Sequence, residues 1–151
     1  MPTTINADTV VGGAIITGDT SGQLTLQTAG TNALSLVSGA VVNPTITNYT
    51  ETRYTANSST AITLNLANGT MQDITLTGSP TITMPTPAAG KSFLLMLRTG
   101  TGSFTVTWST VKWAGGTAPT ITSTASRMDI FSFFSDGTNW YGVTAGQNYT
   151  P

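Results

Sequence analysis

Hydrophobic and polar residues alternate with a period of two along much of the chain. The alternation is clearest at residues 23–27, 61–66 and 103–108, where every second side chain is apolar. Because successive side chains of a strand point to opposite faces of its sheet, this pattern predicts strands that are buried on one side. No window of eleven residues carries the 3.6-residue period of an amphipathic helix.

Further strands are predicted where apolar or β-branched residues run between turn-forming residues, at 73–77, 80–84, 91–99, 119–123, 127–135 and 138–143. Asp136-Gly137 is the clearest hairpin turn, because both residue types tolerate a positive φ. Short strands spaced by about eight to twelve residues are typical of a sandwich or barrel. We therefore predict an all-β fold, an antiparallel β-sandwich of the jelly-roll kind.

The strand at 127–135 is apolar on both faces. Phe131 and Phe133 share one face, while Ile130 and Phe134 lie on the other. A strand of this kind is usually buried on both sides. We expect it to be a central strand or one that another subunit covers.

Residues 1–48 differ in composition from residues 49–151. The first aromatic residue is Tyr49, and the segment before it is rich in Gly, Ala and Val. Small side chains gain little free energy on burial, so such a segment gains order most readily against a partner. We predict an extended or intertwined N-terminal β arm over 1–48 and a β-sandwich domain over 49–151.

Charged residues are scarce. Only 7% of the chain is Asp, Glu, Lys or Arg, against about 25% in an average soluble domain. Thr occupies 33 positions and Gly 16. Interface cores are depleted in charged side chains, so this composition favours a surface covered by protein partners. A Thr-, Ser- and Asn-rich surface that stays soluble without charge is the alternative.

Nucleic-acid and membrane partners are not expected. The five basic residues stand singly along a chain of net charge −1, whereas phosphate binding needs them grouped. The longest apolar run, residues 93–97, is too short to cross a bilayer. The first residues also lack the basic and apolar regions of a signal peptide.

Catalysis is not expected either. The chain contains no His and no Cys, which excludes His-containing triads, cysteine nucleophiles and thiolate or imidazole metal sites. Its six carboxylates show no spacing that suggests a paired acid and base. Residues 85–92 resemble the end of a phosphate-binding loop but have Pro85 in place of its first Gly, and a β-rich run follows. We predict no enzyme, no catalytic residue, no cofactor and no metal.

Four aromatic residues are the candidates for a binding or interface role: Trp108, Trp113, Trp140 and Tyr141. Flat aromatic rings stack on sugar faces, which would suit glycan recognition. Aromatic residues also supply the largest buried area in cores and between subunits. Because the Trp residues sit inside or beside predicted strands, we favour packing over glycan binding.

From residue 60 to 142 the order of features resembles a module of bacteriophage and prophage virion proteins. Its most specific strings are Trp-Ala-Gly-Gly-Thr-Ala-Pro at 113–119 and Asp-Gly-Thr-Asn-Trp-Tyr-Gly at 136–142. Residues 4–8 and 24–28 are similar to openings of cyanophage and related virion proteins. Further landmarks lie at 68–78, 85–92, 105–108 and 129–131.

The resemblance implies a virion structural protein without catalytic residues. We expect a homotrimeric capsid decoration (cement) protein on the capsid surface, with the major capsid protein or other virion proteins as partners. The main alternative is a short tail fibre or receptor-binding tip that recognises host surface glycans, located in the tail. A chain of 151 residues leaves little room for an attachment domain, a shaft and a tip, which favours the decoration protein. A free sugar-binding module is the third possibility.

Overall fold

The computed structural model describes residues 27–28, 31–32 and 45–151, and the chain divides into two compact units, Met1–Ile46 and Thr47–Pro151. In the first unit, β1 (Gln27–Thr28) and β2 (Thr31–Asn32) form a short antiparallel pair. Most of the arm predicted over 1–48 lies outside the described residues, and so does most of the strand predicted at 23–27. Both remain predictions.

The second unit is built from nine strands. They are β3 (Arg53–Ser58), β4 (Ala61–Thr63), β5 (Met71–Leu76), β6 (Thr81–Thr83), β7 (Ser92–Thr99), β8 (Thr107–Ser109), β9 (Val111–Trp113), β10 (Met128–Ser135) and β11 (Trp140–Tyr149). The only helical elements among the described residues are two 3-10 turns, η1 (Leu66–Asn68) and η2 (Ala114–Gly116). The prediction of a β-rich fold without α-helices is confirmed for this part of the chain.

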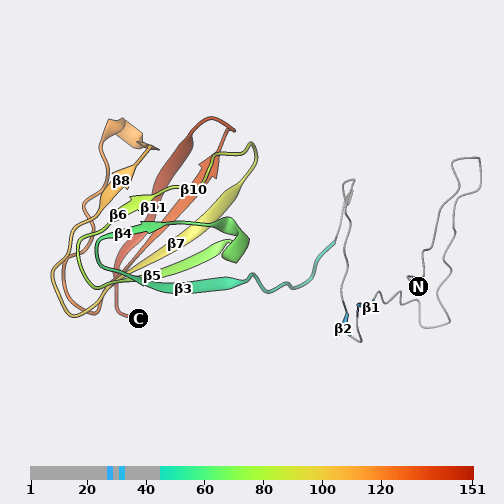
Figure 1. Ribbon diagram of the computed structural model, residues 1–151, viewed down its shortest axis with the longest axis horizontal. Helices are drawn as coiled ribbons and strands as arrows, with labels where there is room; N and C mark the ends of the chain where they lie inside the picture. Colours follow the sequence, from blue (N-terminus) through green and yellow to red (C-terminus); the bar gives the residue numbers. More distant parts are fainter. Residues whose placement is uncertain (1–26, 29–30, 33–44) are drawn as a thin grey trace, which may run out of the picture. The chain divides into compact units, whose positions relative to one another are not determined.

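The strands form two sheets between which the chain alternates (Figure 1). The larger sheet has the order β3-β5-β7-β10-β11-β9, and the smaller has the order β4-β6-β8. From β3 to β8 each strand belongs to the sheet that its predecessor does not. The chain therefore winds as a coil, in which β3, β5 and β7 are parallel and β4, β6 and β8 are parallel.

The antiparallel arrangement that we predicted is wrong for most strand pairs. Of the eight strand pairings in the described residues, five are parallel, including β9 with β11. The pairs are parallel because each bend between β3 and β8 leads the chain into the other sheet. A hairpin would instead return the chain antiparallel within the same sheet. A second crossing then restores the original direction. The sheets are thus mixed, which differs from the antiparallel jelly-roll pattern.

Two glycines mark places where successive turns of this coil approach closely. A Cβ on Gly78 would lie 2.3 Å from the carbonyl oxygen of Ser59, and one on Gly100 would lie 2.6 Å from that of Leu76. Real Cβ atoms do not approach an oxygen so closely, so each position requires glycine for space. In the sequence both glycines look like residues of a local turn. In the structure they allow successive windings of the coil to pack closely against each other.

The hairpin predicted at Asp136-Gly137 is confirmed. β10 and β11 pair antiparallel, with Ser135 opposite Trp140. Gly137 has a φ of 100°, and the Asp136 carboxylate accepts the backbone N–H groups of Thr138 (2.8 Å) and Asn139 (2.7 Å). Of the two turn residues only Gly137 has a positive φ, while Asp136 contributes through its side chain.

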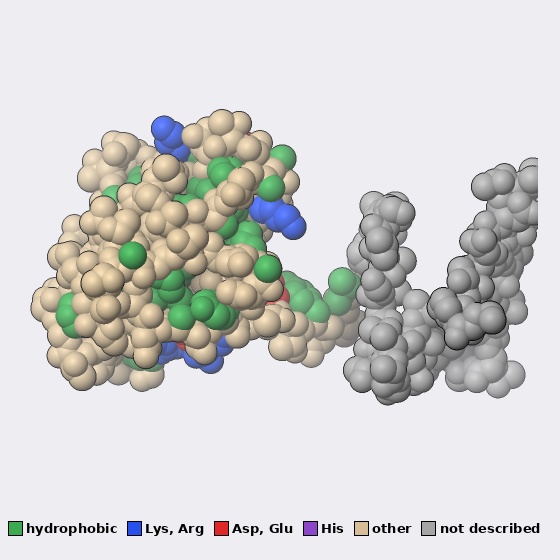
Figure 2. All heavy atoms as spheres, in the orientation of Figure 1, with side chains coloured by type: hydrophobic (Ala, Val, Ile, Leu, Met, Phe, Trp, Pro, Cys, Tyr) green, Lys and Arg blue, Asp and Glu red, His purple; other side chains and the backbone are tan. Residues whose placement is uncertain are grey.

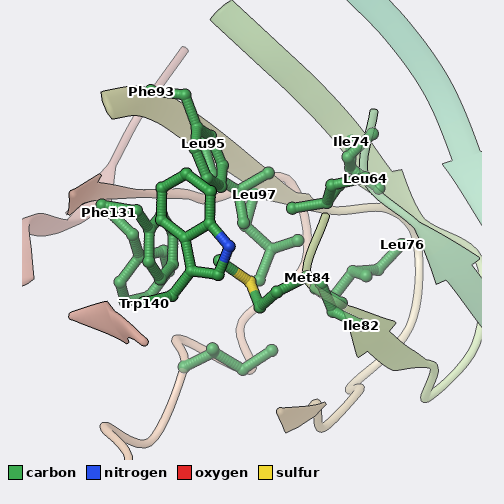
Figure 3. Close-up of a cluster of buried hydrophobic side chains, with 12 residues drawn as sticks. Leu64, Ile74, Leu76, Ile82, Met84, Phe93, Leu95, Leu97, Phe131 and Trp140 are labelled. Atoms are coloured by element: carbon green, nitrogen blue, oxygen red, sulfur yellow. The ribbon is translucent and has the colours of Figure 1, made fainter. Parts of the chain in front are cut away.

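The inner faces of the two sheets share one hydrophobic core. Its buried members are Leu64, Ile74, Leu76, Ile82, Met84, Phe93, Leu95, Leu97, Ile121, Phe131, Phe133 and Trp140. Figure 3 shows the Trp140 indole among side chains of β7 and β10 and beside Met84. Burying each large apolar side chain contributes roughly 1.5–3 kcal/mol, so this cluster is the main stabilising element of the unit.

The strand predictions differ from the structure in several places. β9 was not predicted, and the strand predicted at 103–108 begins only at Thr107. Two further differences have an identifiable cause. β3 was missed because its residues, Arg53–Ser58, include no large aliphatic side chain. It forms a strand at the sheet edge through six backbone pairings with β5. The strand predicted at 119–123 is absent from the described sheets, because the Thr122 N–H donates to the Asp129 carboxylate (2.7 Å) and not to a neighbouring strand.

Candidate functional site

Trp140 is a core residue. Only 1% of its surface is exposed, and its indole Nε1–H donates to the Pro85 carbonyl oxygen (2.7 Å). Its ring meets Phe93 edge to face, with 5.1 Å between centroids. No part of this ring is available to stack on a ligand.

Trp108 and Trp113 belong to the same interior packing. The two rings meet edge to face at 5.2 Å, and each also packs against Phe131 and Phe133. Both are partly buried, and both indole Nε1 atoms are buried without a hydrogen-bond partner. The three Trp residues therefore lie inside the sandwich and do not form an exposed concave site.

Tyr141 is separated from the Trp residues by the sheet itself. It stacks on Phe134, with ring centroids 5.1 Å apart and planes inclined by 15°. Its hydroxyl donates to Asp136 Oδ2 (2.9 Å). Of the four candidate residues, only Tyr141 lies on the outer side.

The hairpin turn keeps Asp136, which bonds to Tyr141, in its ionised form. Backbone N–H groups of Asn139 and Thr138, followed by the Tyr141 hydroxyl, lower the pKa of Asp136 to about 2. The same hydrogen bond to Asp136 raises the pKa of Tyr141. At neutral pH the turn thus holds a carboxylate beside a protonated phenol.

An apolar surface extends from Tyr141 across the centre of the larger sheet. We define the outer sheet face as the side chains of Leu94, Met96, Ile130, Phe134, Tyr141 and Val143, which come from β7, β10 and β11. Three of them are large and exposed: Leu94 (37%), Phe134 (51%) and Val143 (53%). Strand pairing places Phe134 beside Tyr141 and Ile130 beside Met96, while the polar Ser132 of β10 stands between Leu94 and Val143.

The expectation that β10 is a central strand is confirmed, since it lies between β7 and β11, but the described part of the chain does not bury it on both sides. Phe131 and Phe133 are fully buried, but Phe134 on the other face is half exposed. No further layer of the described chain covers the outer face. Sequence reasoning recognised that the strand is apolar on both sides but could not tell whether this chain or another would cover it.

An ion cluster lies on the same face of this sheet, toward the edge formed by β3. Asp73 of β5 is only 2% exposed and accepts hydrogen bonds from Arg53 of β3 and from Arg98 of β7. Arg98 Nε lies 2.7 Å from Oδ1, and its Nη2 lies 3.1 Å from Oδ2. The three residues line an open pocket of about 440 Å³. Sequence reasoning missed this site, because its members are 20 and 25 residues apart.

Comparisons of this chain with protein-family models, with curated proteins and with solved structures found no match. The site is therefore interpreted from its own geometry.

The described surface of the larger unit is largely uncharged (Figure 2). Figure 2 shows one side of the larger unit, on which uncharged groups dominate and charged side chains are few. In the part of the chain that the structure describes, no group of three or more potential metal-ligating side chains comes together. No helix there is long and apolar enough to cross a membrane. The outer sheet face, with the ion cluster beside it, is the candidate functional site.

Proposed function

We propose that this protein is a structural component of a bacteriophage particle, a homotrimeric capsid decoration protein that bridges major capsid subunits and acts without catalysis. The observation that carries the proposal is the outer sheet face. On it Leu94, Phe134 and Val143 are exposed, while Met96, Ile130 and Tyr141 are partly buried beside them. Such residues are enriched at protein interfaces, whereas Lys and Glu are depleted there.

The composition supports the same role. With 7% charged residues, the chain has few long side chains to immobilise when another subunit packs against it. The resemblance of residues 60–142 to phage virion modules adds the biological setting. A decoration protein stabilises a shell because it binds the assembled lattice and not the dissociated subunits.

The alternative, a tail fibre or receptor-binding tip for host glycans, has less support. It depended on exposed Trp rings, and Trp108, Trp113 and Trp140 pack against core aromatics. The exposed Phe134–Tyr141 pair is the remaining feature in its favour. We therefore keep it as the second candidate.

Mass spectrometry of purified heads separated from purified tails tests the proposal. The expected result is that the protein is found with the heads, at a copy number comparable to that of the major capsid protein. Detection in tails alone would replace the proposal by the fibre alternative. Light scattering should give three times the chain mass of 15.6 kDa, and a monomer at micromolar concentration would refute the trimer.

A further inference from the structure

The pocket at the edge of the larger sheet has an unbalanced positive charge. Arg53 and Arg98 carry two charges, and Asp73 neutralises one of them. The remaining lining is uncharged and includes Thr55, Asn57 and Thr75. One of the two positive charges therefore has no carboxylate partner among the lining residues.

The guanidinium groups have free donors. Each carries five N–H groups, and Asp73 accepts one from Arg53 and two from Arg98. The Arg53 side chain is 53% exposed and that of Arg98 is 27% exposed. Their other N–H groups form no hydrogen bond with the described residues, and both arginines line a pocket of about 440 Å³.

Asp73 holds the two guanidinium groups in place. It is 2% exposed, and both carboxylate oxygens accept hydrogen bonds from arginine. A buried carboxylate that is paired in this way fixes the orientation of its donors. Asp73 is thus a positioning residue, and the two arginines form a preorganised pair.

Arg53 is the second partner of Asp73, beside Arg98. Arg98 alone already gives Asp73 a two-point contact, with distances of 2.7 and 3.1 Å. The additional bond comes from Arg53, a half-exposed side chain on the edge strand, and Asp73 keeps its two bonds from Arg98 without it. Arg53 adds a second positively charged side chain to the lining of the pocket.

We propose that this pocket binds the carboxylate of an acidic side chain on the protein surface to which the chain attaches. The planar fork of a guanidinium matches a carboxylate with two parallel hydrogen bonds. The pocket also adjoins the outer sheet face, because Asp73 is the strand partner of Met96, which in turn pairs with Ile130. This inference names the partner chemistry of the proposed function and rests on it.

A protein carboxylate fits better than an acidic sugar. Sugar recognition commonly uses an aromatic platform beside the charge, and the exposed pair Phe134–Tyr141 is remote. Arg98 pairs with Met128 of β10, six residues from Phe134. At about 3.3 Å per residue, six residues along a strand span roughly 20 Å.

The first experiment uses the full chain in solution and does not need the particle. Sodium acetate is titrated against sodium chloride at constant ionic strength while the 15N resonances of the arginine Nε–H groups are followed. Arg53 and Arg98 should shift saturably, and Arg127 should not. A pocket that binds one small carboxylate should be half-saturated at roughly millimolar acetate.

Two matched variants separate the pocket from general charge. Arg53→Gln should weaken acetate binding about tenfold, since one of two guanidinium partners is lost. The chain should stay folded, as judged by an unchanged urea midpoint, because Arg98 keeps both contacts with Asp73. Lys112→Gln removes the same charge from an exposed position of β9 and should leave binding unchanged.

Three outcomes would overturn the inference. They are the absence of any saturable shift, an equal effect of the two substitutions, and tighter binding of phosphate or galacturonate than of acetate. A second arm uses heads stripped of the protein, to which R53Q should bind about tenfold more weakly than wild type. If wild type and R53Q bind heads equally, the carboxylate partner is refuted and the decoration role stands. If acetate binds but wild type does not bind heads, the decoration role fails instead.

Discussion

Trp140 and Tyr141 are adjacent in the chain and lie on opposite faces of the larger sheet. Trp140 is 1% exposed and bonded to the Pro85 carbonyl, whereas Tyr141 stacks on the half-exposed Phe134. The inner face therefore carries the stability of the unit. The outer face carries the candidate interaction, so substitutions on the two faces should affect different measurements.

Trp140→Phe should destabilise the unit by about 2–4 kcal/mol, because it leaves a cavity in the core and an unpaired Pro85 carbonyl. Urea unfolding followed by circular dichroism measures the change. Tyr141→Phe is the matched control and should stay within about 1 kcal/mol of wild type, since only a surface hydrogen bond is lost. A smaller effect for Trp140→Phe than for the control would contradict the assignment of the two faces.

Substitutions on the outer sheet face should weaken association and leave the stability of the unit nearly unchanged. Phe134→Ser combined with Val143→Thr replaces two large exposed apolar side chains and should change the free energy of unfolding by less than about 1 kcal/mol. The same double variant should lose trimer formation by light scattering or binding to heads. Full retention of both would show that the outer sheet face is not the contact surface.

The coil predicts a specific role for Gly78. Gly78→Ala places a Cβ 2.3 Å from the Ser59 carbonyl oxygen, so backbone must shift, at a cost of about 2 kcal/mol or more. Gly115→Ala is the control, because its φ of 70° is strained but nothing lies within 4 Å of the added Cβ. It should cost about 1–2 kcal/mol. Equal melting temperatures for wild type and Gly78→Ala would argue against the stacked coil.

Local features of this fold could be predicted from sequence, and its topology could not. Apolar runs between turn-forming residues located β7 and β10, and Asp136-Gly137 located the hairpin between β10 and β11. The sequence does not distinguish a glycine in a hairpin turn from a glycine that packs against a neighbouring bend. Gly78 therefore did not indicate the parallel coil.

The candidate site was predictable only in part for the same reason. Tyr141 was identified by its residue type, but its partner Phe134 looked like a buried residue. The Arg53–Asp73–Arg98 cluster depends on the parallel pairing of three strands, which a hairpin interpretation does not produce. Scattered single charges were therefore understood as isolated surface residues.

Asp136 should give the unit a dependence on acidic pH. Its pKa in the folded chain is about 2, below the ordinary value of 3.8. A lowered pKa stabilises the folded state above the unfolded pKa, and this contribution is lost as the pH falls from about 4 through 2. The urea midpoint of wild type should fall over this range more steeply than that of Asp136→Asn. Parallel pH profiles for the two proteins would exclude the turn as the source.

Binding to the particle should survive high salt. The chain has eleven charged side chains, and the outer sheet face is apolar, so most of the contact free energy should come from apolar burial and backbone or Thr hydrogen bonds. A single carboxylate in the arginine pocket adds only a modest salt dependence, because a partly buried pair is screened less than exposed charges. The protein is stripped from heads and added back at about 0.05 M and about 1 M NaCl, while occupancy and shell melting are followed.

The size of the effect follows from mass action. At a free concentration of about one hundred times the dissociation constant, each bound site stabilises the shell by roughly 2.7 kcal/mol. Melting should therefore rise with added protein and level off at full occupancy, to a similar extent at both salt concentrations. The double variant Phe134→Ser with Val143→Thr serves as the control and should leave melting at the value of stripped heads. Loss of wild-type binding at 1 M NaCl would show that charges carry the contact, and unchanged melting together with binding to host polysaccharide would favour the fibre alternative.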